Sequence, residues 1–189
     1  MAESKKNNNL ESILKLLKAG KSLLSVGHPE KYLDLIPNIL TEIIPHPEEG
    51  SPRAIVFCTN DETAKALHEQ TAKAAKQNDL TIDLIFEKGN KLKQRNDLFD
   101  GTEIIIGTPK RICELYFQNG FNIGKLKLLI INQMDEQMRL GHKGYISRVA
   151  ESLPKCRQLI FTLNPDEDRT NDYLDKFAPQ TILFDLEQD

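Results

Sequence analysis

Residues 98–111 read LFDGTEIIIGTPKR, and this stretch contains the signals that decide the fold. Residues 104–106 form a wholly apolar run, which is typical of a strand buried on both faces of a sheet. Thr108 and Pro109 follow, and these are residue types that begin a helix, an N-cap and then proline at the first helical position. Gly101 marks the end of a preceding helix. The stretch therefore predicts a helix, a buried strand and a second helix in close succession.

The same alternation extends in both directions along the chain. Strands are expected at residues 23–26, 54–58, 81–86, 104–106, 126–131, 158–163 and 181–184. Helices are expected at residues 10–17, 33–45, 61–77, 91–99, 109–117, 144–153 and 166–177. Apolar strands separated by helices are the pattern of a parallel sheet covered on both faces. We therefore expect one doubly wound α/β domain with a mainly parallel sheet of about seven strands.

Length and composition limit the class of protein. The chain has 189 residues, a net charge of −3, 39% hydrophobic residues and 28% charged residues, which is the balance of a soluble globular domain. Residues 1–9 contain three consecutive asparagines and are expected to form a disordered polar tail, so the domain is expected to span residues 10–189. No apolar run approaches the ~20 residues that cross a bilayer, and the N-terminus lacks the apolar segment of a signal peptide. We expect a cytoplasmic protein without a membrane partner.

The cysteines and histidines indicate no metal site. Cys58, Cys113 and Cys156 are odd in number and far apart, which predicts reduced thiols and neither a disulfide framework nor a zinc site. The four histidines have no helical pairing at three or four residues. We therefore assign no metal ligand.

The loop after the first strand is where a phosphate-binding loop would lie, because ligands bind at the carboxyl ends of parallel strands. Residues 26–32 read VGHPEKY, and Lys31 is the candidate nucleotide-binding residue. Pro29 has no N–H group, Glu30 carries a negative charge, and Tyr32 replaces the small hydroxyl that would contact magnesium. The alternative interpretation of Lys31 is a solvated lysine at the start of a helix.

The loop after the strand at 126–131 is the expected place of catalytic carboxylates. A nucleotide hydrolase needs carboxylates there to hold Mg²⁺ and to orient the attacking water. Asn132 and Gln133 have the shape of Asp and Glu without the charge, and Met134 and Asp135 follow them. We therefore assign no catalytic residue.

A local basic surface is expected around the strand at 104–106. A helix N-terminus attracts anions, and Lys110 and Arg111 add positive charge to the helix that begins at Pro109. Further cations surround Gly89, namely Lys88, Lys91, Lys93 and Arg95. Together they form a candidate nucleic-acid contact. The alternative is an ordinary charged helix surface.

Taken in order, these loops resemble the first RecA-like domain of DEAD-box RNA helicases. Residues 108–111, TPKR, are similar to the family's T-P-G-R motif, with Lys110 in place of glycine. Residues 132–135, NQMD, are similar to D-E-A-D, of which only Asp135 is kept. Weaker similarities lie at residues 59–64 and 162–164 and at Gly89, near a glycine pair of the family. The resemblance covers about residues 10–189.

The resemblance implies a three-layer RecA-like fold of the P-loop NTPase kind and an RNA-related function. It places a single-stranded RNA contact at Gly89, Thr108, Pro109, Lys110 and Arg111. It places ATP and Mg²⁺ near Lys31 and residues 132–135. In that family ATP lies between two RecA-like domains, and this sequence resembles the first of them.

Because the acids and glycines of these motifs are replaced, we expect a degenerate DEAD-box helicase-like domain. It would bind RNA weakly, or a protein partner, without hydrolysing ATP, and would thus be a pseudoenzyme. One alternative is an ATP-dependent RNA helicase or ATPase half-module that works with a second RecA-like domain from another chain. Another is a scaffold on the same fold that binds only protein.

Overall fold

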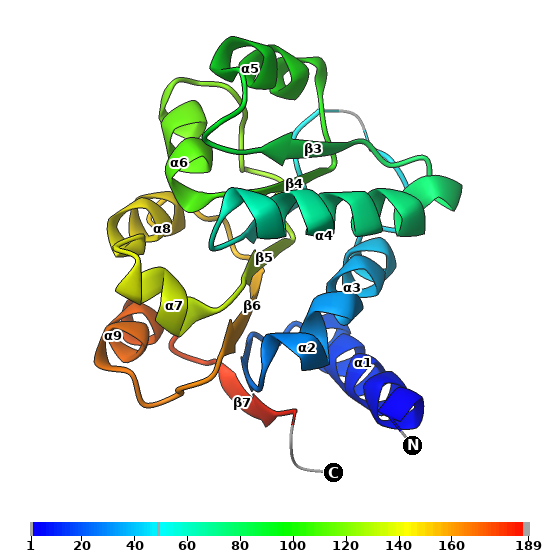
Figure 1. Cartoon of the computed structure of the whole chain (residues 1–189), viewed down its shortest axis with the longest axis vertical. Helices are drawn as coiled ribbons and strands as arrows, with labels where there is room; N and C mark the ends of the chain where they lie inside the picture. Colours follow the sequence, from blue (N-terminus) through cyan, green and yellow to red (C-terminus); the bar gives the residue numbers. More distant parts are fainter. Residues whose placement is uncertain (1, 49, 187–189) are drawn as a thin grey trace.

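A seven-stranded sheet forms the centre of the molecule, in the order β3-β4-β2-β5-β6-β1-β7 (Figure 1). The computed structural model describes residues 2–48 and 50–186, so Met1, Glu49 and the last part of the expected domain, 187–189, lie outside it. The strands are β1 (Leu23–Val26), β2 (Ala54–Phe57), β3 (Ile82–Ile85), β4 (Ile104–Gly107), β5 (Leu128–Ile131), β6 (Arg157–Thr162) and β7 (Ile182–Asp185). All neighbouring strands pair in parallel. The predicted single α/β domain with seven strands is confirmed.

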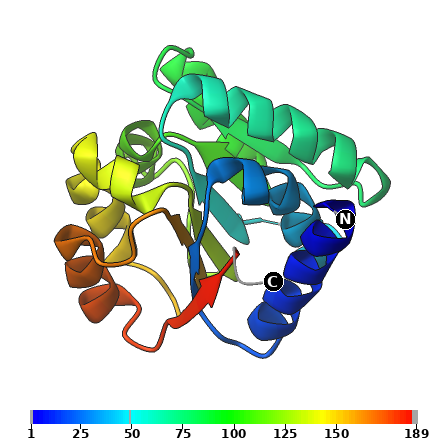
Figure 2. The same cartoon turned by 60° about the horizontal axis from the view of Figure 1, so that its bottom comes forward.

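Helices cover both faces of this sheet (Figures 1 and 2). One layer contains α1 (Ala2–Lys18), α3 (Ile36–Ile43) and α4 (Asp61–Ala74), and the other contains α6 (Pro109–Phe117), α7 (Met134–Arg139), α8 (Lys143–Ala150) and α9 (Asp168–Phe177). Shorter elements are α2 (Pro29–Tyr32), η1 (Leu33–Leu35) and η2 (Ala75–Gln77), and α5 (Lys91–Asp100) lies beyond β3. Among the described helices, none has both the length and the apolar character that a membrane span requires.

The central strands β2, β4 and β5 are buried along their whole length, which explains their continuous apolar sequences. Successive side chains point to opposite faces. Val56 and Ile106 therefore pack in the core under α1, α3 and α4, whereas Ile55 and Ile105 pack in the core under α6 to α9. The helices on both faces thus leave the ends of the strands as the place where polar loops can meet.

The first helix differs from the expectation for residues 1–9. It begins at Ala2, so residues 2–9 are helical where a disordered polar tail is predicted. Extending a helix that is already nucleated costs little, and the apolar residues from Leu10 onward pack on the core and hold the helix in place. The Lys6 ammonium also pairs with the Asp34 carboxylate of η1 at 2.8 Å.

Two further elements differ from the sequence pattern. The helix expected over residues 33–45 is divided into η1 and α3, and α2 precedes it. The short helix α7 was not predicted from periodicity, because its six residues span fewer than two turns and bury a polar residue, Gln137, beside Met134 and Met138. This helix lies directly after β5, and it therefore shapes the candidate site.

The three cysteines are free thiols, as the sequence predicts. Cys58 and Cys113 are buried and Cys156 is half-buried. Burial raises the pKa of Cys58 to about 12 and the pKa of Cys156 to about 11, which keeps both thiols protonated near neutral pH.

We predict that Gly107→Ala destabilises the domain strongly. A Cβ atom at Gly107 would collide with the backbone carbonyl oxygen of Ile85, so β3 and β4 would have to separate. The expected loss in the free energy of unfolding, measured by urea denaturation, is about 2 kcal/mol or more. Gly144→Ala is the control, since a Cβ on this α8 residue meets no atom within 4 Å. It should be neutral or stabilise by up to ~1 kcal/mol. Equal stabilities of the two variants would contradict the close packing of β3 on β4.

Candidate functional site

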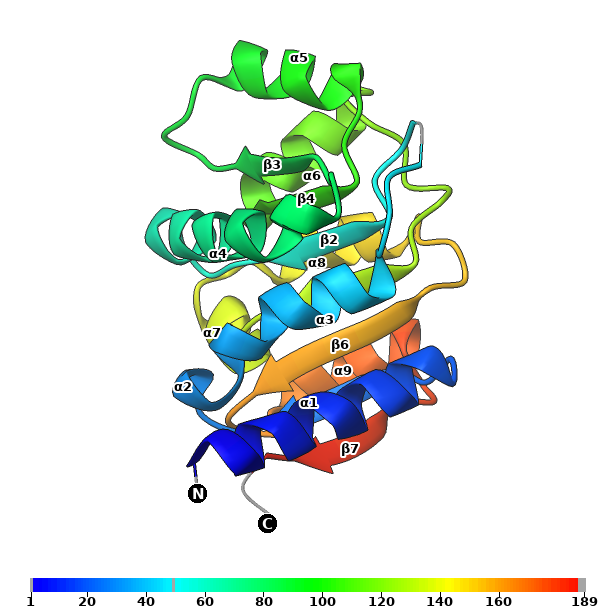
Figure 3. The same cartoon turned by 90° about the vertical axis from the view of Figure 1, so that its right-hand side faces the viewer.

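The predicted site residues lie at the carboxyl edge of the sheet, on the left in Figure 3, where α2 and α7 begin. They form two groups. Lys31 and residues 132–135 lie at the ends of β1 and β5, while Gly89, Lys110 and Arg111 lie beyond β3 and β4. The strand order separates the two groups, because β2 lies between β4 and β5.

The first group is organised by a buried hydrogen bond between two side chains. The Tyr32 hydroxyl donates to Asn132 Oδ1 at 2.8 Å, and the exposed fractions of these residues are 1% and 0%. Since β6 lies between β1 and β5, Tyr32 reaches across β6 and stacks on the Phe161 ring, with centroids 3.9 Å apart and planes 5° apart. Burial raises the pKa of Tyr32, so the phenol stays neutral. Tyr32 and Asn132, which lie in two separate loops of the sequence, therefore form one neutral interaction.

A second network of neutral groups extends from Asn132 to α8. The buried Gln137 amide nitrogen donates to the Asn132 backbone carbonyl at 3.2 Å and to the Phe57 carbonyl at 3.3 Å. The Gln137 Oε1 atom lies 2.6 Å from His142 Nδ1, which can donate to it. Burial lowers the pKa of His142, which favours its neutral form. The Asn132 Nδ2 atom is buried and has no partner among the described residues.

The connection from β1 to α2 uses its backbone N–H groups within the protein. Gly27 N–H donates to the Thr162 carbonyl at 3.0 Å, and Lys31 N–H donates to the His28 carbonyl at 2.9 Å. Pro29 has no N–H group. A phosphate-binding loop instead directs successive N–H groups at its ligand. Two N–H groups of residues 27–31 are therefore already used within the protein, and Pro29 has none to offer a phosphate.

Residues 133–135, in the loop after β5, are constrained by backbone conformation, by burial or by a hydrogen bond. Gln133 has a φ of 49°, in the left-handed region that a non-glycine residue seldom adopts. Met134 is fully buried. The Asp135 carboxylate accepts a hydrogen bond from Leu163 N–H at 3.4 Å, which ties α7 to the loop after β6. In the described part of the chain, no group of three or more His, Cys, Asp or Glu side chains could hold a metal ion.

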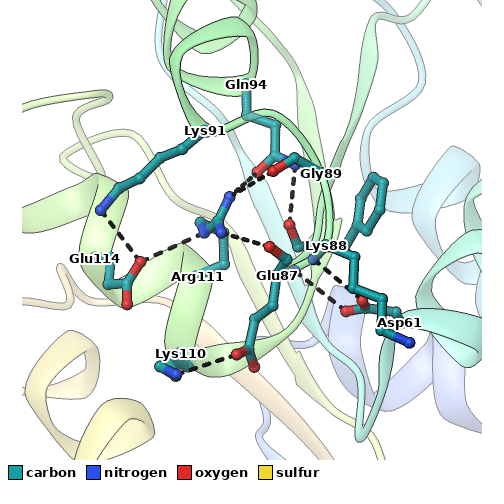
Figure 4. Close-up of polar contacts among 10 residues, drawn as sticks. Asp61, Glu87, Lys88, Gly89, Lys91, Gln94, Lys110, Arg111 and Glu114 are labelled. Carbon is teal, nitrogen blue, oxygen red and sulfur yellow. Dashed lines mark hydrogen bonds and ion pairs between the residues drawn. The ribbon is translucent and has the colours of Figure 1, made fainter.

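The second group is centred on Arg111, whose side chain is only 12% exposed (Figure 4). Its guanidinium donates to the backbone carbonyls of Glu87 at 2.6 Å and Gly89 at 3.2 Å. It also donates to Gln94 Oε1 at 3.3 Å and lies 3.4 Å from a Glu114 carboxylate oxygen. Arg111 therefore orders the loop after β3, and both of its terminal nitrogens donate hydrogen bonds inside the protein.

Lys110 is more accessible than Arg111. Its ammonium lies 3.2 Å from the Glu87 carboxylate, its side chain is 44% exposed, and this hydrogen bond raises its pKa (Figure 4). The Asp61 carboxylate accepts hydrogen bonds from the backbone N–H groups of Glu87 and Lys88 at 3.2 and 3.3 Å. The sequence pattern did not single out Asp61 as a residue that orders the loop after β3. Its place shortly after a buried strand, at the carboxyl edge of the sheet, was a usable signal.

Four other predicted members of the basic surface are buried or paired. Thr108 is 3% exposed and Pro109 is buried, so neither side chain can reach a large ligand without rearrangement. Thr108 is the N-cap of α6 and Pro109 occupies its first turn, but the Thr108 hydroxyl makes no capping hydrogen bond. Two lysines pair with carboxylates, Lys91 with Glu114 and Lys93 with Asp97. Arg95 is exposed.

Comparison with known proteins gives a consistent result. The model of the DEAD/DEAH box helicase family matches residues 19–163. ATP-dependent RNA helicase RhlB of Pseudoalteromonas atlantica is 29% identical over 63% of this chain and 28% of its own length. ATP-dependent RNA helicase eIF4A of Eremothecium gossypii is 21% identical over 74% of this chain and 35% of its own length. The chain thus spans about a third of the length of these two relatives.

Solved structures show the same fold. A DEAD box protein from the hyperthermophile Methanococcus jannaschii superposes with a TM-score of 0.79 at 16% identity, over 90% of this chain and 47% of that chain. The yeast DEAD-box splicing factor Prp28 superposes with a TM-score of 0.78 at 12% identity, over 86% of this chain and 40% of that chain.

We predict that Tyr32→Phe destabilises the domain. The variant keeps the stacking on Phe161 but leaves Asn132 Oδ1 buried without a donor, which should cost about 1–3 kcal/mol in the free energy of unfolding. Tyr116→Phe is the control, since the Tyr116 hydroxyl makes no hydrogen bond within the described part of the chain and its loss should change stability by less than ~0.5 kcal/mol. Urea denaturation measures both. If both variants are as stable as the parent, the Tyr32–Asn132 bond does not hold this edge of the sheet.

Proposed function

Because the chain belongs to the DEAD/DEAH box helicase family, we propose that it is a domain of this family that binds single-stranded RNA and does not hydrolyse ATP. The observation that carries the second part is the buried hydrogen bond between Tyr32 and Asn132. It occupies the place where the resemblance puts the magnesium-binding hydroxyl and the first carboxylate of the D-E-A-D motif. A neutral phenol and a neutral amide there satisfy each other.

The residues present do not fit Mg²⁺ and a triphosphate. Magnesium prefers anionic oxygen ligands in octahedral geometry, and Asn132 offers only an amide oxygen that already accepts a hydrogen bond. Asp135, the remaining acid of residues 132–135, is bound to the Leu163 backbone. The backbone N–H groups of Gly27 and Lys31 donate to carbonyls, and the exposed Glu30 would repel phosphates. Phosphoryl transfer depends on charge and positioning, and both are missing from this arrangement.

The proposed RNA contact lies beside β3 and β4. Arg111 holds the loop that contains Gly89, and Lys88 and Lys110 present their ammonium groups beside it (Figure 4). The ion pair of Lys110 with Glu87 is exposed, so it contributes little and a phosphate can replace the carboxylate. The neighbouring carboxylate also weakens the attraction for RNA. We therefore propose weak binding that tolerates any sequence and falls steeply with salt.

We predict that the purified chain shows no magnesium-dependent ATPase activity with or without RNA. The measurement is steady-state phosphate release with excess Mg²⁺, with the Lys31→Ala variant beside the parent. Both proteins should remain at background, because neither has a carboxylate that could hold the metal at position 132. Sustained phosphate release that is lost in the Lys31→Ala variant would instead identify an ATP-dependent helicase half-module.

We predict that Lys110→Ala weakens RNA binding while the fold stays intact. Loss of one phosphate contact should make the slope of log K against log salt shallower by about 0.7 for a single strand. Lys110 is preferred to Arg111 as the test, since replacing Arg111 would also release the loop after β3. Fluorescence anisotropy with a labelled oligouridylate measures the affinity.

Lys73→Ala is the matched control for this experiment. Lys73 is likewise an exposed lysine in an ion pair, with Glu69 on α4. Its variant should bind RNA like the parent. Equal affinities of the Lys110 and Lys73 variants would remove Lys110 from the RNA contact, and no binding by the parent would favour a scaffold that binds only protein.

A further inference from the structure

Two cavities of similar size are lined by segments at the amino edge of the sheet, opposite the candidate site. This edge of the sheet lies on the right in Figure 3. One, of about 800 Å³, lies where β1, β5, β6 and β7 begin. The other, of about 770 Å³, lies where β2, β4 and β5 begin. Both volumes are in the range of ligand sites in proteins. The lining of the first cavity is rich in lysine and arginine, whereas the lining of the second contains neither.

The larger cavity is basic, and we name it the basic pocket. None of the described residues in its lining is acidic. Six cationic residues line it, namely Lys18, Lys21, Lys127, Lys155, Arg157 and Lys176. They come from the end of α1, the segments before β1, β5 and β6, the first residue of β6, and α9. Such a concentration of positive charge is unexpected in a chain with a net charge of −3. Bringing these separate segments together therefore creates a local field that the composition does not reveal.

Carboxylates outside the lining neutralise only some of these cations. Lys18 pairs with Glu42, Lys127 with Glu48 and Lys176 with Glu151. These ion pairs are exposed to water, so a phosphate can compete with each carboxylate at little cost. Lys21 and Lys155 are exposed and have no charged partner in the described part of the chain. The pocket thus retains about three positive charges in excess, which is more than a single phosphate neutralises.

Helix termini alone do not explain these lysines. Helices end at the amino edge of a parallel sheet, and their carbonyl groups attract cations. However, the second cavity lies against the ends of α5 and α6 and is lined by Asp100 and by no lysine or arginine. In the basic pocket, the Leu17 carbonyl accepts from Arg157 and the Phe177 carbonyl from Gln158. The lysine ammonium groups are therefore not required to satisfy these helix ends.

We propose that the basic pocket is a second RNA site, which binds consecutive phosphates of a single strand on its lysines. The proposal rests on the RNA binding proposed above, but it concerns the opposite edge of the sheet. Half-buried Phe177 and Leu153 add apolar side chains to the lining, against which a base can pack between the cations. Ser22 and Gln180 add polar groups to the lining. The two unpaired lysines, Lys21 and Lys155, are the groups that gain most from a phosphate partner.

The test is photochemical crosslinking of the full chain to a short oligouridylate that contains 4-thiouridine, followed by peptide mapping. The parent should crosslink within residues 153–158 and 176–180 in addition to residues 87–111. Lys21→Gln with Lys155→Gln should reduce the yield at the first two segments at least fivefold and leave the third unchanged. The slope of log K against log salt should become shallower by about 1.4, for two lost contacts. Lys73→Gln with Lys76→Gln is the control of equal charge, on α4 and η2, and should change neither.

The outcomes separate the two proposals. Crosslinks at residues 87–111 alone, or pocket crosslinks that persist in the Lys21/Lys155 variant, would overturn the second site and leave the proposed function standing. Equal losses in the pocket variant and in the control would show a general charge effect and would also overturn it. An absence of RNA binding in the parent would overturn both proposals.

Discussion

The hydrogen bond from Tyr32 to Asn132 makes the carboxyl edge between β1 and β5 a closed and electrically neutral region. The tyrosine crosses the end of β6, stacks on Phe161 and closes the space between three neighbouring strands. A side chain of this size excludes water, and exclusion of water makes an unpaired charge expensive. Asn132 is the neutral residue that can accept the phenolic hydrogen there without carrying a buried charge. The tyrosine and the asparagine therefore form one neutral unit, in which each side chain satisfies the buried polar group of the other.

The same principle explains the second group of residues at this edge. Arg111 is nearly buried, and its guanidinium has acceptors on the loop after β3 and on Gln94. A buried charge requires such partners, since its desolvation must be compensated. Arg111 is thus a structural cation that fixes the loop, and the neighbouring Lys110 is more accessible. Residues 108–111, which the sequence suggests as one contact surface, therefore differ in role: Arg111 holds the loop after β3, and Lys110 faces solvent.

The sequence predicted the sheet well, because its determinants are local and periodic. The apolar runs at residues 54–58 and 104–106 are typical of buried strands. Pro109 marks the start of α6. The helix α7 and residues 2–9 were not predicted correctly, since a short helix and a polar helical end are stabilised by tertiary contacts such as the pair of Lys6 with Asp34. The bond of Tyr32 with Asn132 links residues 100 positions apart, and no spacing rule could have joined them. Likewise, the partners of Arg111 became visible only once β3 and β4 lay side by side.

The distribution of charge follows from the parallel topology. Every connection from helix to strand ends at the amino edge, so segments far apart in sequence meet there without any local motif. Lys21, Lys155 and Lys176 converge in this way, and each alone looks like an ordinary surface lysine. Carboxylates lie beside cations at both edges, Glu87 and Glu114 at the carboxyl edge and Glu42, Glu48 and Glu151 around the basic pocket. Among the described residues, the lining of the basic pocket combines six cations with no acidic side chain, so unmatched positive charge is concentrated there. A net charge of −3 thus conceals a polar asymmetry that only the folded arrangement of the strands produces.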